Sequence, residues 1–597
     1  MDGTLAPATR SHAMTASSVQ SNESCTPENT FDLTLYLPPT TLNPLTSLAG
    51  TGYIWELEYP GATDYLSNGS EVSYLLSNWS HNANYTEWTL NIKPGLKWSN
   101  GQPVTSQDLL TSEGSTFAFN SSYDYLGLGR EIVNEYAINS SAAVFILNDS
   151  NAHFVDELSA DGQHGTPVLP ASVIDEFGAD YPNLGTDVSM GPFYVSNYNV
   201  GTSSLIMYRN PYFTPEPSIC EIDVSYVERL TLTTSVLEAR MTDLAPIDPF
   251  DVAAIDKIPN LGAFIEKNSG TATLEYNDSI YPYDQLAFRQ ALVYGINQTA
   301  FIQAAYDGYA STAYSSEAGT PPDDGYWYNP NLVQYSYDPS KAESLLAGIG
   351  ITKGANGLLH YANGTQVVLT LWTDVDGTED AAGAQVVQTN LEQLGFQVNL
   401  VVTTSYNIEG DYGANSNGIR SDLILFTDYG INPANPLVIA LPACDTEWLP
   451  DDCSTNFLFP SSAQLEYQSN FSSFTSTSNQ SLEHNYLFNI QYLESYYLPT
   501  TVLAYPDFVW GYSNAHWINW PNSSSGRIDE GPPEVPNLTM WETLTPVQGS
   551  PSRPVMFGSS LFFVSLDIAG IVAVGLCVVL LFLYYRKRHT GEVATSC

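Results

Sequence analysis

The chain has 597 residues, of which 64 are acidic and 18 are basic, and its formal net charge at pH 7 is −46. Charged residues make up only 14% of the chain, whereas a halophile-type surface needs many more carboxylates. No basic stripe precedes the C-terminal region, which argues against nucleic-acid binding. Carboxyl groups are mostly neutral near their ordinary pKa of about 4, so we expect an acidic exterior, as for an acidophile.

The chain begins with a small polar segment, residues 1–28, in which we expect a disordered leader. This segment has neither the basic nor the apolar stretch of a signal peptide, so the start is truncated or replaced, or a later segment directs export. The body that follows is too long for one hydrophobic core, and we expect two or three lobes.

Strand-like and helix-like segments alternate through this body. Period-two alternation predicts strands at 31–37, 88–92, 144–148, 204–210, 221–227, 273–277, 367–372, 397–403 and 422–428. Helical periodicity predicts helices at 106–117, 233–241, 283–296, 338–350 and 381–395. Ser340 or Asp338 fits an N-cap, and Gly350 and Gly395 fit C-caps. Such alternation is typical of α/β lobes with mixed sheets.

One segment, EWTLNIKPGLKWSNGQPVTSQDLLTS at 87–112, combines a predicted strand, a turn and a helix. Gly101 and Pro103 predict a tight turn. Ser106 is expected to cap a helix whose first turn holds Asp108.

This segment resembles the signature of family 5 extracellular solute-binding proteins, the dipeptide/oligopeptide-type partners of ABC importers. The residues that carry the resemblance are Lys97, Trp98, Gly101, Pro103, Val104, Thr105 and Asp108. Further segments resemble the family in its own order, at 190–213, 274–302, 335–351, 385–402 and 497–514. The matches extend over nearly the whole body.

The resemblance implies an α/β, two-lobed, periplasmic-binding-protein-like fold of type II with an extra subdomain. Ligand would be enclosed between lobes that close about two crossover strands, near 270–276 and 500–506. The expected divisions are lobe 1 at about 29–272 and 506–545, an inserted subdomain at about 60–182, and lobe 2 at about 273–505.

The family binds solutes and catalyses nothing, so the resemblance implies a component that captures peptides for an ABC permease and its ATPase. Oligosaccharides are the alternative ligand, and a membrane-anchored acid hydrolase is the contrasting class. The chain has no Gly-rich phosphate loop, GxSxG elbow or HExxH motif, and its histidines are scattered. We therefore expect no enzyme activity, no cofactor and no metal site.

In peptide-binding members of the family, an Asp near the end of a strand receives the α-ammonium group of the peptide. By this resemblance Asp428 holds that position, with Tyr429 beside it. A buried carboxylate and an ammonium each leave the other unpaired if one is lost, which makes the pair a specificity device. The simpler interpretation is that Asp428 caps the following turn. Phe426 stands one residue from the family's usual Trp, which places it on the other strand face.

Aromatic side chains are a second resource for ligand binding, because they stack on sugar rings or peptide side chains. The candidates are Tyr53, Trp55, Trp372 and Tyr505, and Tyr123 and Tyr125 are further candidates. In a chain with 39 Tyr and 11 Trp, a single aromatic residue is more often part of the core or of the ordinary surface.

Four cysteines precede the C-terminal region: Cys25, Cys220, Cys444 and Cys453. An even number in an exported chain predicts disulfides, and Cys444 with Cys453 would close a short loop. The body also carries Asn-x-Ser/Thr glycosylation sequons at Asn68, Asn78, Asn84, Asn120, Asn139, Asn148, Asn277, Asn297, Asn363, Asn470, Asn479, Asn522 and Asn537.

A long apolar stretch near the C-terminus, within 559–585, predicts one transmembrane helix. A Pro/Gly/Ser-rich linker precedes it at 546–558, and Arg586, Lys587 and Arg588 follow it at once. Because such basic clusters stay on the cytoplasmic side, we expect an extracellular body, a single-pass anchor in the cell membrane and a cytoplasmic tail at 586–597. This arrangement fits an archaeal-style member of the family, which no outer membrane confines.

Overall fold

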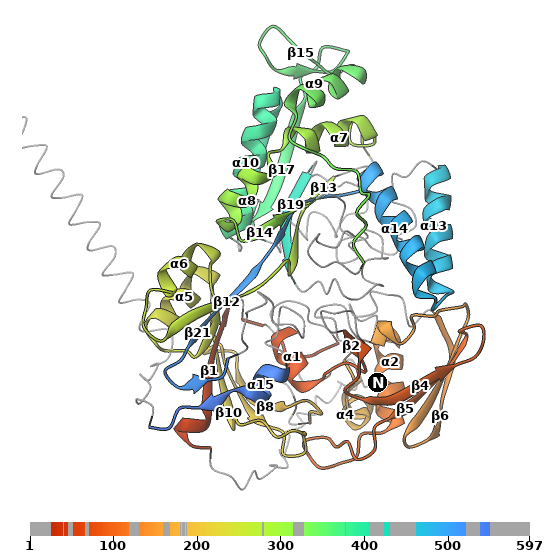
Figure 1. Cartoon of the computed structure of the whole chain (residues 1–597), viewed down its shortest axis with the longest axis vertical. Coiled ribbons are helices and arrows are strands. Elements are labelled where there is room, and N and C mark those ends of the chain that lie inside the picture. The colour runs from red at the N-terminus through yellow and green to blue at the C-terminus, as the bar shows by residue number, and fades with distance from the viewer. Residues whose placement is uncertain are drawn as a thin grey trace, which may run out of the picture.

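The computed structural model describes residues 25–36, 38–39, 41–45, 52–65, 71–118, 131–158, 167–178, 181, 186, 188–276, 280–313, 327–375, 378–404, 423–429, 461–520 and 538–549. These residues form a seven-stranded, a six-stranded and a four-stranded sheet with helices around them. Figure 1 shows the six-stranded sheet in the upper half of the molecule and the other two in the lower half. The predicted two-lobed α/β class is therefore confirmed.

The seven-stranded sheet has the order β12-β21-β11-β1-β10-β9-β8. Its strands are β1 (Thr30–Tyr36), β8 (Phe193–Asn199), β9 (Ser204–Arg209), β10 (Glu221–Val227), β11 (Leu244–Pro246), β12 (Leu261–Glu266) and β21 (Phe508–Ser513). The central strand β1 runs parallel to β10 and β11, and the outer pairs are antiparallel. A disulfide joins Cys25 to Cys220, and it ties the segment before β1 to the segment before β10.

The six-stranded sheet has the order β14-β20-β13-β19-β17-β18. Its strands are β13 (Gly270–Tyr276), β14 (Ala310–Thr312), β17 (Val368–Asp374), β18 (Gln397–Thr403), β19 (Leu423–Tyr429) and β20 (Thr501–Pro506). It packs against α7 (Leu286–Gly295), α8 (Gln298–Tyr306), α9 (Pro339–Gly348) and α10 (Thr378–Leu394). One continuous apolar cluster joins one face of this sheet to the four helices.

Local sequence signals explain where these helices begin and end. The Asp338 side chain accepts a hydrogen bond from Lys341 N at 3.0 Å and so caps α9. Gly350, after α9, and Gly395, directly after α10, have φ of +81° and +102°, a conformation that favours glycine. The predicted caps at Asp338 and at the two glycines are confirmed.

The four-stranded sheet has the order β4-β5-β7-β6 and belongs to a subdomain with its own apolar core. Its strands are β4 (Leu76–His81), β5 (Glu87–Ile92), β6 (Ile132–Asn139) and β7 (Ala142–Leu147), and its helices are α2 (Ser106–Ala118) and α4 (Ala171–Phe177). The structure corrects one prediction here, because Ser106 does not cap α2. Its hydroxyl donates to Asn139 O at 2.6 Å instead.

Asp108 holds the start of α2 in place of Ser106. Its carboxylate accepts hydrogen bonds from Thr105 N at 2.7 Å and from the Thr105 hydroxyl at 3.0 Å. The other oxygen accepts from Ala171 N at 2.9 Å, at the first residue of α4. The carboxylate therefore fastens two helix N-termini together, where a negative charge is favourable.

A helical hairpin, α13 (Ser461–Thr475) and α14 (Gln480–Tyr497), lies beside the six-stranded sheet in Figure 1. The hairpin packs around Trp327 and Phe474. The buried guanidinium of Arg289, in α7, donates to Tyr497 O and Leu498 O at the end of α14. Arg289 thus joins the hairpin to the lobe that carries the six-stranded sheet.

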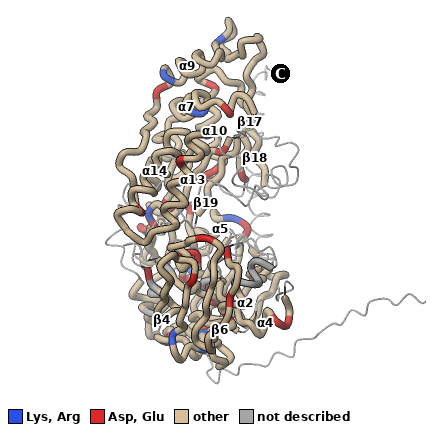
Figure 2. The backbone as a smooth tube through the Cα atoms, turned by 90° about the vertical axis from the view of Figure 1, so that its right-hand side faces the viewer, with Lys and Arg blue, Asp and Glu red and all other residues tan. Residues whose placement is uncertain are grey.

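Shorter elements complete the described structure. They are η1 (Pro27–Asn29), α1 (Gly52–Glu58), β2 (Asp64–Tyr65), β3 (Glu71–Val72), η3 (Asp156–Leu158), α5 (Leu230–Glu238), η5 (Pro249–Asp251), α6 (Val252–Ile255), β15 (Thr352–Lys353), β16 (Leu359–His360), β22 (Trp517–Ile518), α15 (Leu538–Thr543) and β23 (Thr545–Pro546). Pro546 pairs with Trp517, so the start of the predicted linker still belongs to the body. Figure 2 shows acidic positions in both halves of the molecule and few basic ones.

The structure leaves several predictions untested. The segments 1–24 and 559–597, which hold most of the predicted leader, the anchor and the tail, lie outside the described residues, as do Tyr123, Tyr125, Cys444 and Cys453. Within the ranges that are described, no helix is both long enough and apolar enough to cross a membrane.

Candidate ligand site and hinge

The chain changes from one large sheet to the other at two points. Strand β12 of the seven-stranded sheet is followed by β13 of the six-stranded sheet, with residues 267–269 between them. The return is from β20 to β21, with Asp507 as the single intervening residue. The two crossovers are the places where one lobe can turn relative to the other. They lie a few residues from the crossover strands that the sequence predicts.

Asp507 fastens the two crossovers to each other, although it is only 2% exposed. Its Oδ2 lies 2.5 Å from Lys267 Nζ, and its Oδ1 accepts a hydrogen bond from Asn268 N at 3.0 Å. The Ser269 hydroxyl accepts from Phe508 N at 3.0 Å and donates to Glu266 O at 2.7 Å. Each crossover therefore supplies partners to the other, and we expect them to move together.

The lobes pack closely beside this hinge. The rings of Tyr429, at the end of β19, and Phe508, in β21, lie edge to face with centroids 5.2 Å apart. A hollow next to them has a volume of about 10 Å³, roughly what one water molecule needs. Both lobes line it, with Tyr36, Asp248 and Phe508 from one and Tyr306, Glu379 and Tyr429 from the other. The hollow is too small for a peptide or a sugar.

A buried polar chain holds the end of β19 in place. Tyr306 OH and Thr427 Oγ1 lie 2.6 Å apart, and the Thr427 hydroxyl also donates to Asp380 Oδ1 at 2.6 Å. Burial, reinforced by the neighbouring charge of Glu379, raises the pKa of Asp380 well above its ordinary value. The chain fixes residue 427, directly before Asp428. This chain was not predicted, although a carboxylate in the first turn of a helix after a strand, as at Asp380, is a recognisable signal.

Asp428 lies at the crossover end of the six-stranded sheet. In the antiparallel ladder it is the partner of Thr271, and Tyr429 is the partner of Gly270, the first residue after the hinge segment. The backbone of the predicted ammonium site therefore lies where the two lobes meet. The side chain of Asp428 lies outside what the structure describes.

One face of this sheet carries buried polar atoms that have no hydrogen-bond partner among the described residues. They are Thr271 Oγ1, Thr273 Oγ1 and Trp372 Nε1. Strand register places Thr273 opposite Phe426, and Trp372 beside Ile424. Buried polar groups of this kind normally find a partner, because leaving one unsatisfied costs about 1–3 kcal/mol. An indole donor and two hydroxyl groups are therefore buried on this face of the sheet.

Strand alternation separates this face from the apolar core. Leu371, Leu423 and Leu425 belong to the core under α10, whereas Trp372 and Phe426 alternate with them and are half-buried. The structure thus brings two of the predicted aromatic residues to the strands that end near Asp428.

The other aromatic candidates lie elsewhere. Trp55, in α1, is 5% exposed, packs in the subdomain core and directs its indole nitrogen at Leu42 O, 3.4 Å away. Tyr505, in β20, is 2% exposed and packs with Ala313 and Val502. The side chain of Tyr53 lies outside the described part of the chain. A ligand-binding role for these three stays a prediction.

The structure separates the glycosylation sequons by exposure. Six of the described asparagines are exposed: Asn78, Asn84, Asn139, Asn148, Asn363 and Asn479. Asn297 is half-buried and caps α8, and Asn470 is buried with its amide bonded to Glu466 O and Asn489. The remaining sequons, Asn68, Asn120, Asn277, Asn522 and Asn537, lie outside the described residues. In the part of the chain that the structure describes, no group of three or more His, Cys, Asp or Glu could hold a metal ion.

Comparison with known proteins agrees with this architecture. Among curated relatives, the nickel-binding periplasmic protein of Escherichia coli is 22% identical over 373 residues, which cover 60% of this chain and 68% of the relative. The dipeptide-binding protein of the same organism is 24% identical over 306 residues, which cover 47% of this chain and 55% of the relative.

Solved structures share the fold over most of the chain. The mannohexaose-bound oligopeptide-binding protein of Thermotoga maritima has a TM-score of 0.72 at 19% identity and covers 88% of this chain and 100% of its own. The oligopeptide-binding protein AppA of Bacillus subtilis, in complex with a nonapeptide, has a TM-score of 0.69 at 16% identity, with the same coverage.

A family model identifies the group to which these proteins are related. The model described as bacterial extracellular solute-binding proteins, family 5 middle, matches residues 72–433, which is more than half of the chain. Members of this family are binding proteins rather than enzymes. The protein belongs to the family 5 extracellular solute-binding proteins.

Proposed function

We propose that this protein captures peptides outside the cell by closing its two lobes around them, and delivers them to an ABC permease and its paired ATPase. Family membership supports the role of binding a solute. The observation that carries the choice of ligand is the ladder position of Asp428 beside the hinge, on strands that also hold the buried polar atoms of Thr271, Thr273 and Trp372. Peptide backbones supply both donors and acceptors for such atoms.

Asp428 would receive the α-ammonium group of the peptide. Its ladder position beside the hinge favours this role, because a charge there is shielded from water when the lobes close. The polar chain from Tyr306 through Thr427 to Asp380 would keep the strand end rigid.

Oligosaccharides are the second candidate ligand. Neutral hydroxyl and indole groups suit sugar hydroxyls as well as peptide amides, and Trp372 offers an aromatic ring for stacking. A relative of similar fold from Thermotoga maritima has been seen with mannohexaose.

Calorimetric titration of the full chain at acid pH distinguishes these ligands. A tripeptide should bind saturably, and its N-acetylated form should bind roughly thirtyfold more weakly, as expected if about 2 kcal/mol of charge pairing is lost. Asp428→Asn should remove this difference, whereas Asp284→Asn, elsewhere in the same lobe, should keep it. Saturable binding of malto- or cello-oligosaccharides only, unaffected by Asp428→Asn, would overturn the peptide assignment.

The body would stay near its permease through the predicted anchor at 559–585. A tether raises the effective concentration of the binding protein at the membrane. Fractionation of cells that express the full chain should place it in the membrane, with the body open to external protease. Release of the full chain as a free protein would contradict the anchor.

Glycosylation is a second consequence of an extracellular body. Glycans at the exposed sequons, such as Asn139 and Asn363, should appear in glycopeptide mass spectra, and unmodified peptides at every sequon would contradict that assignment.

A further inference from the structure

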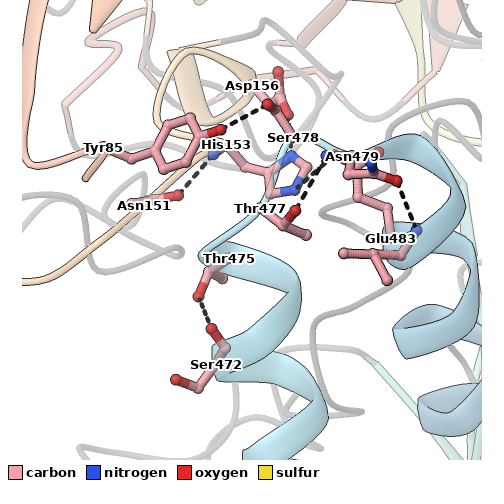
Figure 3. Close-up of polar contacts among 11 residues, drawn as sticks. Tyr85, Asn151, His153, Asp156, Ser472, Thr475, Thr477, Ser478, Asn479 and Glu483 are labelled. Carbon is pink, nitrogen blue, oxygen red and sulfur yellow. Dashed lines mark hydrogen bonds and ion pairs between the residues drawn. The ribbon is translucent and has the colours of Figure 1, made fainter. Parts of the chain in front are cut away.

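The lobes touch at a second place, on the side of the molecule opposite the hinge. There the subdomain meets the turn between α13 and α14, as Figures 1 and 3 show. Ala152 N donates to Thr475 O at 2.5 Å, and Tyr85 OH lies 2.7 Å from Ser478 Oγ. The two sides are more than 300 residues apart in sequence, so tertiary packing brings them together.

His153 occupies the centre of this contact. Its ring stacks on Phe474, with centroids 4.1 Å apart and an interplanar angle of 12°. Its Nδ1 lies 2.5 Å from Asp156 Oδ2, and its Nε2 lies 3.9 Å from Glu483 Oε1 in α14. The side chains of His153, Asp156 and Glu483 are only 6%, 12% and 10% exposed. The imidazole therefore stands between a carboxylate of its own lobe and one of the opposite lobe.

The other ionisable groups described around this contact are His81, whose ring stacks on Tyr85 with centroids 4.4 Å apart, and several carboxyl groups. Glu157 and Glu131 both accept hydrogen bonds from the Asn151 amide, at 2.5 Å and 2.9 Å. Glu71 interacts with Asp156, and burial together with that charge raises the pKa of Glu71 to about 8. Of these groups, His153 is the one that lies between carboxylates of both lobes.

We propose that His153, Asp156 and Glu483 form a pH-sensitive latch, which holds the lobes closed when His153 is protonated and releases them when it is neutral. A protonated imidazole attracts the carboxylates on both sides of the contact. A neutral imidazole leaves the acidic groups of the subdomain facing Glu483 without a compensating charge, and like charges in a poorly hydrated contact repel. The latch acts on the hinge closure of the proposed function.

The direction of the effect follows from the charges. Histidine side chains in general change their charge between about pH 5 and pH 8, so a fall in pH favours the protonated form of the latch. Burial raises the pKa of Glu483, the charge of His153 opposes that rise, and the charge of Asp156 adds to it. Repulsion across the contact therefore decreases toward acid pH, and closure becomes more favourable without ligand.

Double electron–electron resonance on the full chain tests the latch. Labels carried by unnatural amino acids at Val133 and Leu465, which are 60% and 67% exposed, report the distance across the contact. Without ligand, the closed-to-open ratio should be about fivefold higher at pH 5 than at pH 8, the upper end for a partly screened pair. Equal distance distributions at the two pH values would overturn the latch.

Variants separate the latch from a general effect of pH. His153→Phe keeps a ring on Phe474 and should lose the pH dependence, whereas His360→Gln, in the far hairpin of the other lobe, should keep it. If His153→Phe does not fold, Glu483→Gln, which removes the opposing charge, should favour closure at pH 8. Unchanged pH dependence in both latch variants would refute the proposal.

Measurements on the same samples distinguish a failure of the latch proposal from a failure of the peptide assignment. If peptide fails to bind but the distance still responds to pH through His153, the latch holds and the peptide assignment falls. If peptide binds and closes the lobes at both pH values with no effect of His153→Phe, the latch falls and the assignment holds.

Discussion

The hinge and the latch are both contacts between the lobes, but different chemistry holds them together. At the hinge, Asp507 accepts from Lys267 and from a backbone N–H, and strands pass through the contact. At the latch, His153 stands between carboxylates, and none of the described strands passes from one lobe to the other. Lysine keeps its charge across the physiological pH range, whereas histidine changes its charge within it. The hinge can thus be permanent while the latch responds to conditions.

The largest expected effect comes from breaking the hinge contact. Asp507→Ala leaves Asn268 N–H without its acceptor and Lys267 without its partner, and we expect the free energy of unfolding to fall by about 2–3 kcal/mol. The side chain of Lys267 is 45% exposed, which keeps the figure below that of a fully buried pair. Urea denaturation followed by tryptophan fluorescence measures it.

Two further variants test whether the loss of stability in Asp507→Ala is specific to the hinge contact. Asp507→Asn keeps an acceptor oxygen and should lose less, and the exposed Asp256→Ala should lose almost nothing. A loss with Asp256→Ala equal to that with Asp507→Ala would show that the effect is not specific to the hinge.

The second largest effect is a pH dependence of stability that comes from Glu58 and belongs to neither the hinge nor the latch. Burial raises the pKa of Glu58 to about 8, although its carboxylate accepts a hydrogen bond from Val195 N at 2.7 Å. The folded state therefore holds a proton that the unfolded state releases above about pH 4.5, and stability is lost as pH rises from there toward pH 8. We expect a loss of about 2 kcal/mol by pH 6.

Thermal denaturation from pH 4 to pH 8 measures this loss, and Glu58→Gln should flatten the profile because its amide stays neutral. Glu87→Gln, an exposed position in β5, is the matched control. A stability maximum at pH 7 to 8 would contradict both this assignment and the acidic exterior inferred from composition.

The smallest expected effect comes from the hydrogen bond between Tyr85 and Ser478, which lies beside the latch. Tyr85→Phe removes one exposed hydrogen bond to Ser478, and we expect the closed-to-open ratio to fall about twofold, with its pH dependence unchanged. The same distance measurement across the contact detects it. Loss of the pH response in Tyr85→Phe would move the sensing group away from His153.

The fold was largely predictable because strand patterns repeat every two residues. The strands predicted at 221–227 and 397–403 coincide with β10 and β18, and the glycine helix ends were also correct. Helix starts were less accurate, since α5 begins three residues before the predicted 233 and Ser106 bonds a distant carbonyl instead of capping α2. A local pattern does not show which distant group takes a hydroxyl.

The site was predictable only in part. The resemblance located Asp428 on a strand, but not the Tyr306–Thr427–Asp380 chain that holds the strand end, since its members are spread over more than 100 residues. His153 looked like one scattered histidine among eight in the sequence. Its carboxylate Glu483 comes from a different lobe, and tertiary packing alone brings the two together.

Closure on ligand is tested most directly by the distance between Val133 and Leu465, measured at pH 8, where the latch favours the open state, with and without a saturating peptide digest. Peptide should shift the distribution to a single short distance, and Asp507→Ala should broaden it again. A distribution that peptide leaves unchanged, in a chain that is folded by circular dichroism, would contradict a binding protein that closes its lobes on peptide.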